Sequence, residues 1–123
     1  MTTALVIEDN PDNMLLICDI LEFNDCGVLK AETGLQGVSM AKELVPDFIL
    51  LDIQLPDIDG YKVLQRIRAS EEARSIPIVA MTSYAMVGDR EKLMDSGCDG
   101  YIEKPIDPGV VMEQIQRAIG GKA

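Results

Sequence analysis

Three carboxylates, one hydroxyl and one ammonium group follow short apolar runs of this 123-residue chain. Such runs are typical of parallel strands that are buried on both faces. In an open parallel sheet, ligands bind just outside the carboxyl ends of the strands. The sequence therefore predicts that these polar groups meet in one small cleft. They are Glu8 and Asp9 after residues 5–7, Asp52 after residues 48–51, Thr82 after residues 78–81, and Lys104, behind Glu103, after residues 101–102.

An excess of acidic residues and a lack of histidine limit the possible chemistry. The chain has 21 acidic and 11 basic residues, a formal charge of −10. Phosphate backbones repel such a surface, so direct nucleic-acid binding is not expected. The charge favours solubility, and part of it could serve a cation site and basic partners. Without histidine, the commonest general base and metal ligand is missing, and most catalytic triads are excluded.

The cysteines and the hydropathy pattern indicate a cytoplasmic protein. Cys18, Cys26 and Cys98 are odd in number and fit no zinc-binding spacing. Unpaired thiols suit a reducing compartment, and Cys18, on an apolar helical stripe, is expected in the core. No run of about 18 apolar residues indicates a membrane span, and the first residues do not resemble a secretion signal.

Strand and helix patterns alternate along the whole chain. Most predicted helices begin at a polar capping residue and continue with an apolar stripe. In the second helix the stripe is Leu35, Val38, Ala41 and Val45, whereas the fourth helix, over residues 84–96, is weakly predicted because a glycine interrupts it. The predicted starts of the other helices are Asn10-Pro11, Thr33 in a capping-box spacing with Gln36, Asp59, and Asp107-Pro108.

Five strand–helix units with short connections predict one α/β domain over residues 1–123. Right-handed crossovers place helices on both faces of a parallel sheet, which gives a three-layer, doubly wound sandwich. No linker, low-complexity stretch or repeat interrupts the pattern. An additional output domain is therefore not expected.

Short motifs stand at the predicted strand ends: VIEDN at 6–10, LLDIQLP at 50–56, Gly60, MTS at 81–83 and KP at 104–105. Each motif alone is weak, but their order and spacing span essentially the whole chain. Together they resemble the receiver domain of two-component response regulators, the CheY-like family with a flavodoxin-like fold. The stretch from Glu8 to Asn13 is most similar to stand-alone DivK-type regulators and to receivers of hybrid kinases.

The resemblance implies a sheet of strand order 2-1-3-4-5 and a magnesium site. That order places Glu8 and Asp9 beside Asp52 at the topological switch point. Carboxylates so close repel one another, and a hard divalent cation with oxygen ligands relieves the repulsion. By resemblance, Mg²⁺, or Mn²⁺ in its place, is bound by Asp9, Asp52 and the backbone carbonyl of Gln54, with Glu8 contributing mainly through water.

The resemblance also implies a reaction. Asp52 would be the nucleophile that takes a phosphoryl group from a phosphohistidine of a histidine kinase or a phosphotransfer protein. Lys104 and the cation would neutralise the phosphoryl oxygens, and Thr82 would hydrogen-bond one of them. No general base is needed, which suits a chain without histidine. The protein would phosphorylate and dephosphorylate itself without turnover of a diffusible substrate.

By resemblance, phosphorylation switches a distant face of the domain. Thr82 would move toward the phosphoryl group, and Tyr101 would turn inward behind it. This movement changes the face made by the fourth helix, fifth strand and fifth helix, where a downstream protein would bind. A cis peptide bond before Pro105 would aim Lys104 inward.

Three residues beside the cleft are expected to set reaction rates. Gln54, Ser83 and Tyr84 flank the predicted site and would tune phosphorylation and hydrolysis. A large Tyr84 would restrict an attacking water molecule, which predicts a relatively long-lived phosphoryl group.

Each polar residue also has a purely structural interpretation. Asp52 could cap a turn, Glu8 and Asp9 could be a solvated pair, Thr82 is a good strand residue, and Lys104 could be a surface lysine. Tyr101 is more often a core or rim aromatic than a switch. The joint pattern at the strand ends favours the functional interpretation over these separate ones.

Three competing functions and one alternative context remain open. A haloacid-dehalogenase-type phosphatase needs a second aspartate two residues after its nucleophile, where Gln54 stands. A flavodoxin-like cofactor carrier needs a phosphate loop after the first strand, where Glu8 and Asp9 would repel phosphate. A degenerate receiver would not keep the complete set of site residues. The chain could also be a receiver excised from a hybrid histidine kinase or a larger regulator.

Overall fold

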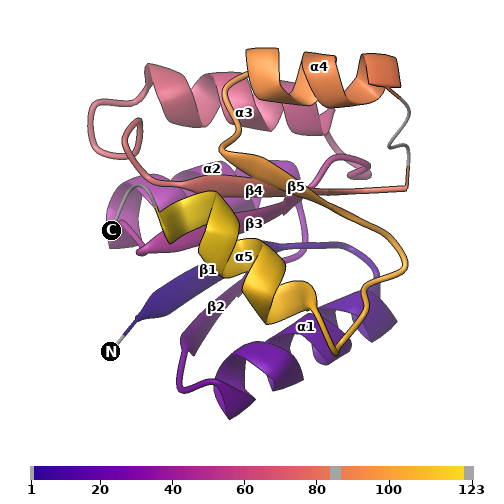
Figure 1. The fold of residues 1–123 in the computed structure, drawn as a ribbon. Helices are drawn as coiled ribbons and strands as arrows, with labels where there is room; N and C mark the ends of the chain where they lie inside the picture. Colours follow the sequence, from indigo (N-terminus) through magenta and orange to yellow (C-terminus); the bar gives the residue numbers. More distant parts are fainter. Residues whose placement is uncertain (1, 84–86, 121–123) are drawn as a thin grey trace.

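The computed structural model describes residues 2–83 and 87–120, in which five parallel strands form one sheet of order β2-β1-β3-β4-β5 (Figure 1). A helix follows each strand. This architecture confirms the predicted α/β sandwich and strand order. The strands are β1 (Thr3–Ile7), β2 (Gly27–Ala31), β3 (Phe48–Asp52), β4 (Ile78–Thr82) and β5 (Gly100–Glu103), and the helices are α1 (Pro11–Phe23), α2 (Gly34–Leu44), α3 (Gly60–Ala69), α4 (Val87–Asp95) and α5 (Val111–Ile119).

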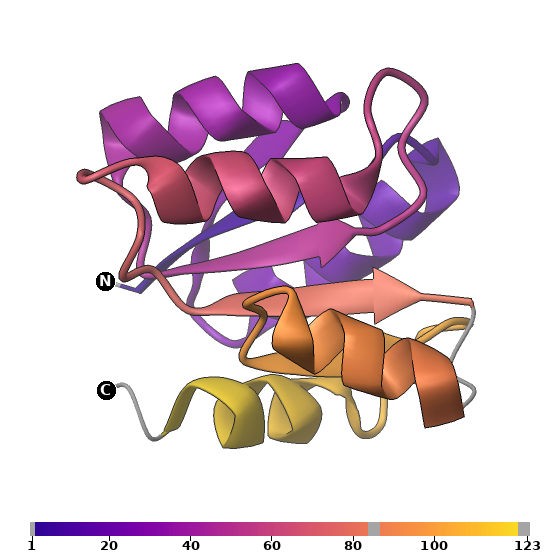
Figure 2. The same cartoon turned by 90° about the horizontal axis from the view of Figure 1, so that it is seen from above.

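Helices cover both faces of the sheet. α1 and α5 lie on one face, and α2, α3 and α4 lie on the other (Figures 1 and 2). Alternate residues of a central strand enter two separate cores. In β1, Leu5 and Ile7 belong to the core under α2 and α3, whereas Ala4 and Val6 belong to the core under α1 and α5. Both sets must be apolar, which explains why the central strands are unbroken apolar runs.

Strand register brings the polar residues to one edge of the sheet. Ile7 of β1 pairs with Leu51 of β3, so that the residues after β1 lie beside the last residue of β3, Asp52. Asp52 pairs in turn with Met81, the residue before Thr82. The carboxyl ends of β1, β3 and β4 therefore lie side by side at the same edge of the sheet, as the sequence predicts.

Side-chain caps start the first three helices where they are predicted. Asn10 Oδ1 accepts hydrogen bonds from the backbone N–H groups of Asp12 and Asn13, at 2.9 and 3.1 Å. Asp59 Oδ1 accepts a hydrogen bond from the N–H of Tyr61 at 2.9 Å. These bonds satisfy N–H groups that have no partner within a helix, and so they fix where α1 and α3 leave the site edge.

The capping box predicted for α2 is only half formed. Thr33 Oγ1 accepts a hydrogen bond from the N–H of Gln36 at 3.1 Å. The Gln36 side chain, however, accepts from the N–H of Glu32 instead of that of Thr33. Thr33 is thus the cap of α2, as predicted, but the reciprocal bond goes to the preceding residue.

The last helix begins later than the sequence indicates. Asp107 makes a turn, in which its Oδ1 accepts from the N–H of Gly109 and its carbonyl accepts from the N–H groups of Val110 and Val111. α5 then starts at Val111, without a side-chain cap. Val111, the first residue of α5, is buried in the core.

The stripe predicted for α2 is also partly wrong. Val38 and Ala41 are buried, but Leu35 and Val45 are exposed. The helix instead approaches the sheet through Gly37, at which an added Cβ would lie 2.4 Å from Cδ1 of Ile7. Because a glycine makes this close contact, the buried face lies to one side of the face that the large apolar residues suggest.

None of the helices in the described residues is long and apolar enough to cross a membrane.

Cys18, on α1, is buried in the core between this helix and the sheet, as predicted.

Arg68, at the end of α3, joins the chain segments at the edge opposite the polar cleft. Its guanidinium donates to the carbonyl oxygens of Gly97, Arg74 and Ile76, at distances between 2.7 and 3.0 Å. It also forms an ion pair of 3.1 Å with Asp99, whose carboxylate accepts the N–H of Ile78 at the start of β4. One side chain therefore holds the entries to β4 and β5.

Replacing Arg68 with alanine should destabilise the fold. The three carbonyl groups and Asp99 would lose a charged donor in a partly buried place, and we expect unfolding free energy to fall by about 2 kcal/mol. Arg66→Ala, on the exposed side of the same helix, should change it by less than about 0.5 kcal/mol. Urea unfolding followed by circular dichroism measures both, and equal effects would contradict this role of Arg68.

Candidate functional site

The five polar residues predicted at the strand ends meet in space. Carboxylate oxygens of Glu8, Asp9 and Asp52 lie within 4.8 Å of one another. The Nζ of Lys104 lies 2.9 Å from Oε1 of Glu8 and 3.2 Å from Oδ2 of Asp52. Thr82 ends β4, and its carbonyl accepts the N–H of Lys104 at 2.8 Å. The predicted convergence of the three carboxylates with the Lys104 ammonium group is therefore confirmed, and Thr82 lies at the adjacent strand end.

Backbone contacts hold Asp52 in place. It is buried as the last residue of β3, and its Oδ1 accepts the N–H of Gln54 at 2.9 Å. The next residue, Ile53, donates its N–H to the carbonyl of Met81 and accepts the N–H of Gly60. One carboxylate oxygen is thus fixed by the loop and the other faces Lys104.

Gly60 allows this loop to pack against α3. A Cβ at this position would lie 2.5 Å from the Cα and 2.7 Å from the carbonyl oxygen of Ile53. Backbone atoms cannot move aside as the end of a flexible side chain can. The glycine in the sequence motif is therefore explained by close approach of helix and loop.

Lys104 bridges two carboxylates from different strands. Burial alone would lower its pKa, but the hydrogen bond to Glu8 and the charge of Asp52 outweigh burial, so the pKa of Lys104 is raised and the side chain stays charged. The peptide bond between Lys104 and Pro105 is cis, as the family resemblance implies.

Glu8 is buried more completely than a carboxylate normally is. Its Oε2 atom has no hydrogen-bond partner within the described chain. Burial, and then the neighbouring Asp52 carboxyl, raises the pKa of Glu8 to about 7, although Lys104 acts in the opposite direction. A buried oxygen without a partner, in a group of three carboxylates, fits the oxygen ligands that a hard divalent cation prefers.

The predicted rate-tuning and switch residues have different surroundings. Gln54 and Ser83 are exposed, and Tyr84 lies outside the described residues. Tyr101 on β5 is half-buried, and the guanidinium of Arg90 lies 5.6 Å from its ring centroid. Arg90 also pairs with Glu103 at 3.3 Å. The Arg90 contact was not predicted, because no spacing in the sequence links α4 to β5.

This fold and this site define a receiver domain. The family model described as "Response regulator receiver domain" matches residues 4–116. The chain therefore belongs to the response regulator receiver family of two-component systems. Proteins of this family generally are not turnover enzymes, and they interact with histidine kinases or phosphotransfer proteins and with downstream targets.

Within the family, the chain is DivK-like. It is 38% identical over 118 residues to the polar-differentiation response regulator DivK of Brucella ovis. The aligned residues make up 96% of each protein. It is 37% identical to DivK of Brucella anthropi over the same length.

Solved structures agree with the fold. The receiver domain of a sensor histidine kinase from Pseudomonas aeruginosa has a TM-score of 0.88 and 37% identity, with 97% of this chain and 98% of that chain covered. That structure has a magnesium ion coordinated in its active-site cleft. The chemotaxis response regulator CheY4 of Vibrio cholerae, with a TM-score of 0.91 and 20% identity over 96% and 98% of the two chains, supports the fold alone.

Glu8 should give the folded protein a measurable pH dependence when EDTA removes divalent cations. The unfolded chain ionises Glu8 near its ordinary pKa of 4.5, whereas the folded protein holds the proton up to about 7. Between these values the folded state binds more protons, so stability falls as pH rises. Compared with Glu8→Gln, the wild type should lose unfolding free energy from about pH 5 to about pH 7.

Urea unfolding at several pH values measures this difference. Adding Mg²⁺ should reduce the loss in the wild type, because the cation offsets the charge of the carboxylates. Parallel stability curves for wild type and Glu8→Gln in EDTA would contradict the raised pKa of Glu8.

Proposed function

We propose that this receiver accepts a phosphoryl group on Asp52 from a histidine kinase or a phosphotransfer protein, and that phosphorylation changes which proteins it binds. One observation carries the proposal. The buried Asp52 carboxylate stands at a strand end in contact with Lys104 and beside two further carboxylates. A residue that only capped a turn would need neither the ammonium group nor the acidic neighbours.

Asp52 would act as the nucleophile. One carboxylate oxygen attacks the phosphorus of a phosphohistidine in line, and the bond between phosphorus and the imidazole nitrogen breaks. The product is an acyl phosphate on Asp52, and the imidazole leaves with the electron pair of that bond. The hydrogen bond from the Gln54 N–H supports this role because it orients the carboxylate before reaction.

Asp9, Asp52 and the backbone carbonyl of Gln54 would hold Mg²⁺, with Glu8 acting mainly through water. When bound, the ion would supply positive charge next to the phosphoryl oxygens. The three clustered carboxylates support this assignment, as does the ion in the Pseudomonas aeruginosa receiver. Mn²⁺ is also expected to bind, since carboxylate and carbonyl oxygens suit both ions.

Lys104 and Thr82 would respond to the new charge. Lys104 already contacts both Glu8 and Asp52. A phosphoryl group on Asp52 brings oxygens that compete with Glu8 for the ammonium group. Thr82, at the end of the adjacent strand, would donate its hydroxyl to another phosphoryl oxygen.

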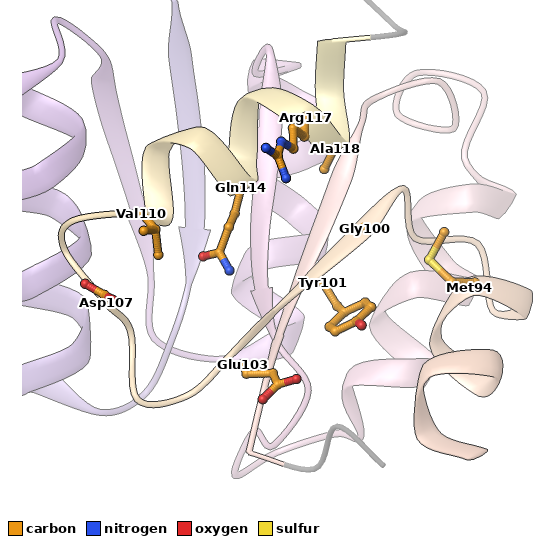
Figure 3. Close-up of a pocket in the computed structure, with 9 residues that line it drawn as sticks. All are labelled: Met94, Gly100, Tyr101, Glu103, Asp107, Val110, Gln114, Arg117 and Ala118. Atoms are coloured by element: carbon orange, nitrogen blue, oxygen red, sulfur yellow. The ribbon is translucent and has the colours of Figure 1, made fainter. Parts of the chain in front are cut away.

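When Thr82 moves, Tyr101 would turn inward behind it. This turn would change the face formed by α4, β5 and α5. In the structure the Tyr101 ring lies between β5 and α4 (Figure 3). α4 is weakly anchored: of its described side chains, Leu93 is the buried one. An element with few buried contacts is easily repositioned, which supports its role in the switch.

The downstream partner would bind at an open groove on this face. The groove has a volume of about 700 Å³ and combines apolar and charged groups (Figure 3). Its lining comes from α4, β5, the following loop and α5: Met94, Gly100, Tyr101, Glu103, Asp107, Val110, Gln114, Arg117 and Ala118. A change in Tyr101 would alter one wall of it.

The rate-tuning roles of Gln54, Ser83 and Tyr84 belong to the same proposal. Gln54 and Ser83 are exposed, and they would act on a water molecule that enters the cleft from solvent. We still expect a relatively long-lived phosphoryl group, because a large Tyr84 would restrict an attacking water molecule.

The cellular context that we propose is a cytoplasmic, single-domain regulator of the DivK kind, formed by residues 1–123. A receiver belonging to a hybrid histidine kinase is the second candidate, supported by 37% identity to the Pseudomonas aeruginosa receiver. The mass of the native protein in cell extract distinguishes the two.

Incubation with acetyl phosphate should add one phosphoryl group to the protein in the presence of Mg²⁺. Asp52→Asn should block the addition, because an amide is not a comparable nucleophile, and EDTA should prevent it in the wild type. Intact-protein mass spectrometry measures the adduct. Lack of an adduct in all conditions, or an unchanged adduct on Asp52→Asn, would refute the proposed acceptor.

Lys104→Arg should separate phosphorylation from switching. A forked guanidinium has a different shape from a compact ammonium group and cannot replace it between two carboxylates. We expect Asp52 still to be modified, but the amide chemical shifts of α4 and β5 to change less than in the wild type when beryllofluoride and Mg²⁺ are added. Shift changes equal to those of the wild type would show that Lys104 does not transmit the signal.

A further inference from the structure

The loop between β3 and α3 carries the Gln54 carbonyl and has no regular secondary structure from Ile53 to Asp59. Its base is fixed by hydrogen bonds of Ile53 with Met81 and Gly60. The remaining part of the loop projects beyond the sheet. The Gln54 N–H is held by Oδ1 of Asp52 at 2.9 Å, so the position of the Gln54 carbonyl depends on this bond together with whatever holds the outer part of the loop.

Asp57 attaches this outer part to a different helix. Its Oδ1 accepts the N–H of Gly34 at 2.8 Å, and its Oδ2 accepts the N–H of Leu35 at 2.9 Å. These N–H groups belong to the first turn of α2, more than 20 residues earlier in the chain. These hydrogen bonds lower the pKa of Asp57, and the bond from Leu35 has the largest effect. The carboxylate is therefore charged at neutral pH.

Packing beside Asp57 reinforces the attachment. Ile58 lies so close to Gly34 that an added Cβ there would be 2.8 Å from Cγ1 of Ile58. Thr33 already caps α2 from within its own segment, by its bond to Gln36. The helix therefore has a local cap without Asp57, and the additional carboxylate joins the loop to the helix.

We propose that Asp57 is a positioning residue of the metal site: by binding the N-terminus of α2, it holds the loop so that the Gln54 carbonyl points toward the carboxylates. This inference rests on the proposed function, because it assumes that Gln54 is a metal ligand. Residues that orient metal ligands without touching the ion commonly affect metal affinity by about tenfold or more. Asp57 would affect Mg²⁺ affinity by restraining the backbone of the loop that carries the Gln54 carbonyl.

Asp57→Ala and Thr33→Ala form a matched pair of variants. Each removes a side-chain cap from the N-terminus of α2, so each should destabilise that helix to a similar extent. Only Asp57→Ala also releases the loop. Mg²⁺ binding, measured by titrating MgCl₂ into ¹⁵N-labelled protein and following amide shifts by NMR, therefore separates helix stability from loop position.

We expect the dissociation constant for Mg²⁺ to rise about tenfold in Asp57→Ala and less than about twofold in Thr33→Ala. Amide hydrogen exchange of Gly34 and Leu35 should become faster in Asp57→Ala. Asp57→Asn, which keeps one acceptor oxygen, should give an intermediate constant and serves in place of the alanine variant if that variant does not fold.

Two results would overturn the inference, and they differ. If the wild type saturates with Mg²⁺ and the Asp57 variants bind it as tightly as Thr33→Ala does, Asp57 is only a helix cap. If the wild type itself does not saturate with Mg²⁺, the proposed metal site is wrong, and this role of Asp57 is lost with it.

Discussion

Repulsion among three carboxylates at one edge of the sheet is the constraint on which the site depends. Glu8, Asp9 and Asp52 lie within 4.8 Å of one another, and two of them are buried. Lys104 partly offsets their charge, but one oxygen of Glu8 still has no hydrogen-bond partner in the described chain. This arrangement supports the proposed binding of a cation, and it is the reason that we expect the site to respond to a new negative charge on Asp52.

The fold gives this site rigid and adjustable parts. The strand register and the close contact of Gly60 with Ile53 fix Asp52 relative to Glu8. On the opposite side, Thr82 ends β4 and Lys104 follows β5, whereas Tyr101 lies within β5, which contacts the lightly anchored α4. In the proposed function, a change of charge on Asp52 would move elements on this second side without disturbing the core.

Sequence alone predicted the parts that depend on local or periodic patterns. Apolar runs identified the strands, and Asn10 and Asp59 identified helix starts, because a cap is decided by neighbouring residues. The start of α5 was not predicted, since Asp107 forms a turn before the helix. The exposure of Leu35 was not predicted either, since the close approach to the sheet is made by Gly37. Likewise, the convergence on Asp52 was predictable, but the pairing of Lys104 with Glu8 and the Arg90 contact with Tyr101 depend on side-chain positions.

The most direct test of the account is a crystal structure of the protein with Mg²⁺ and beryllofluoride, which imitates a phosphoryl group on aspartate. We expect beryllium bonded to a carboxylate oxygen of Asp52, with Lys104 contacting a fluorine atom and separated from Glu8. Beryllofluoride bound elsewhere, or Lys104 still paired with Glu8 when Asp52 carries the group, would contradict it.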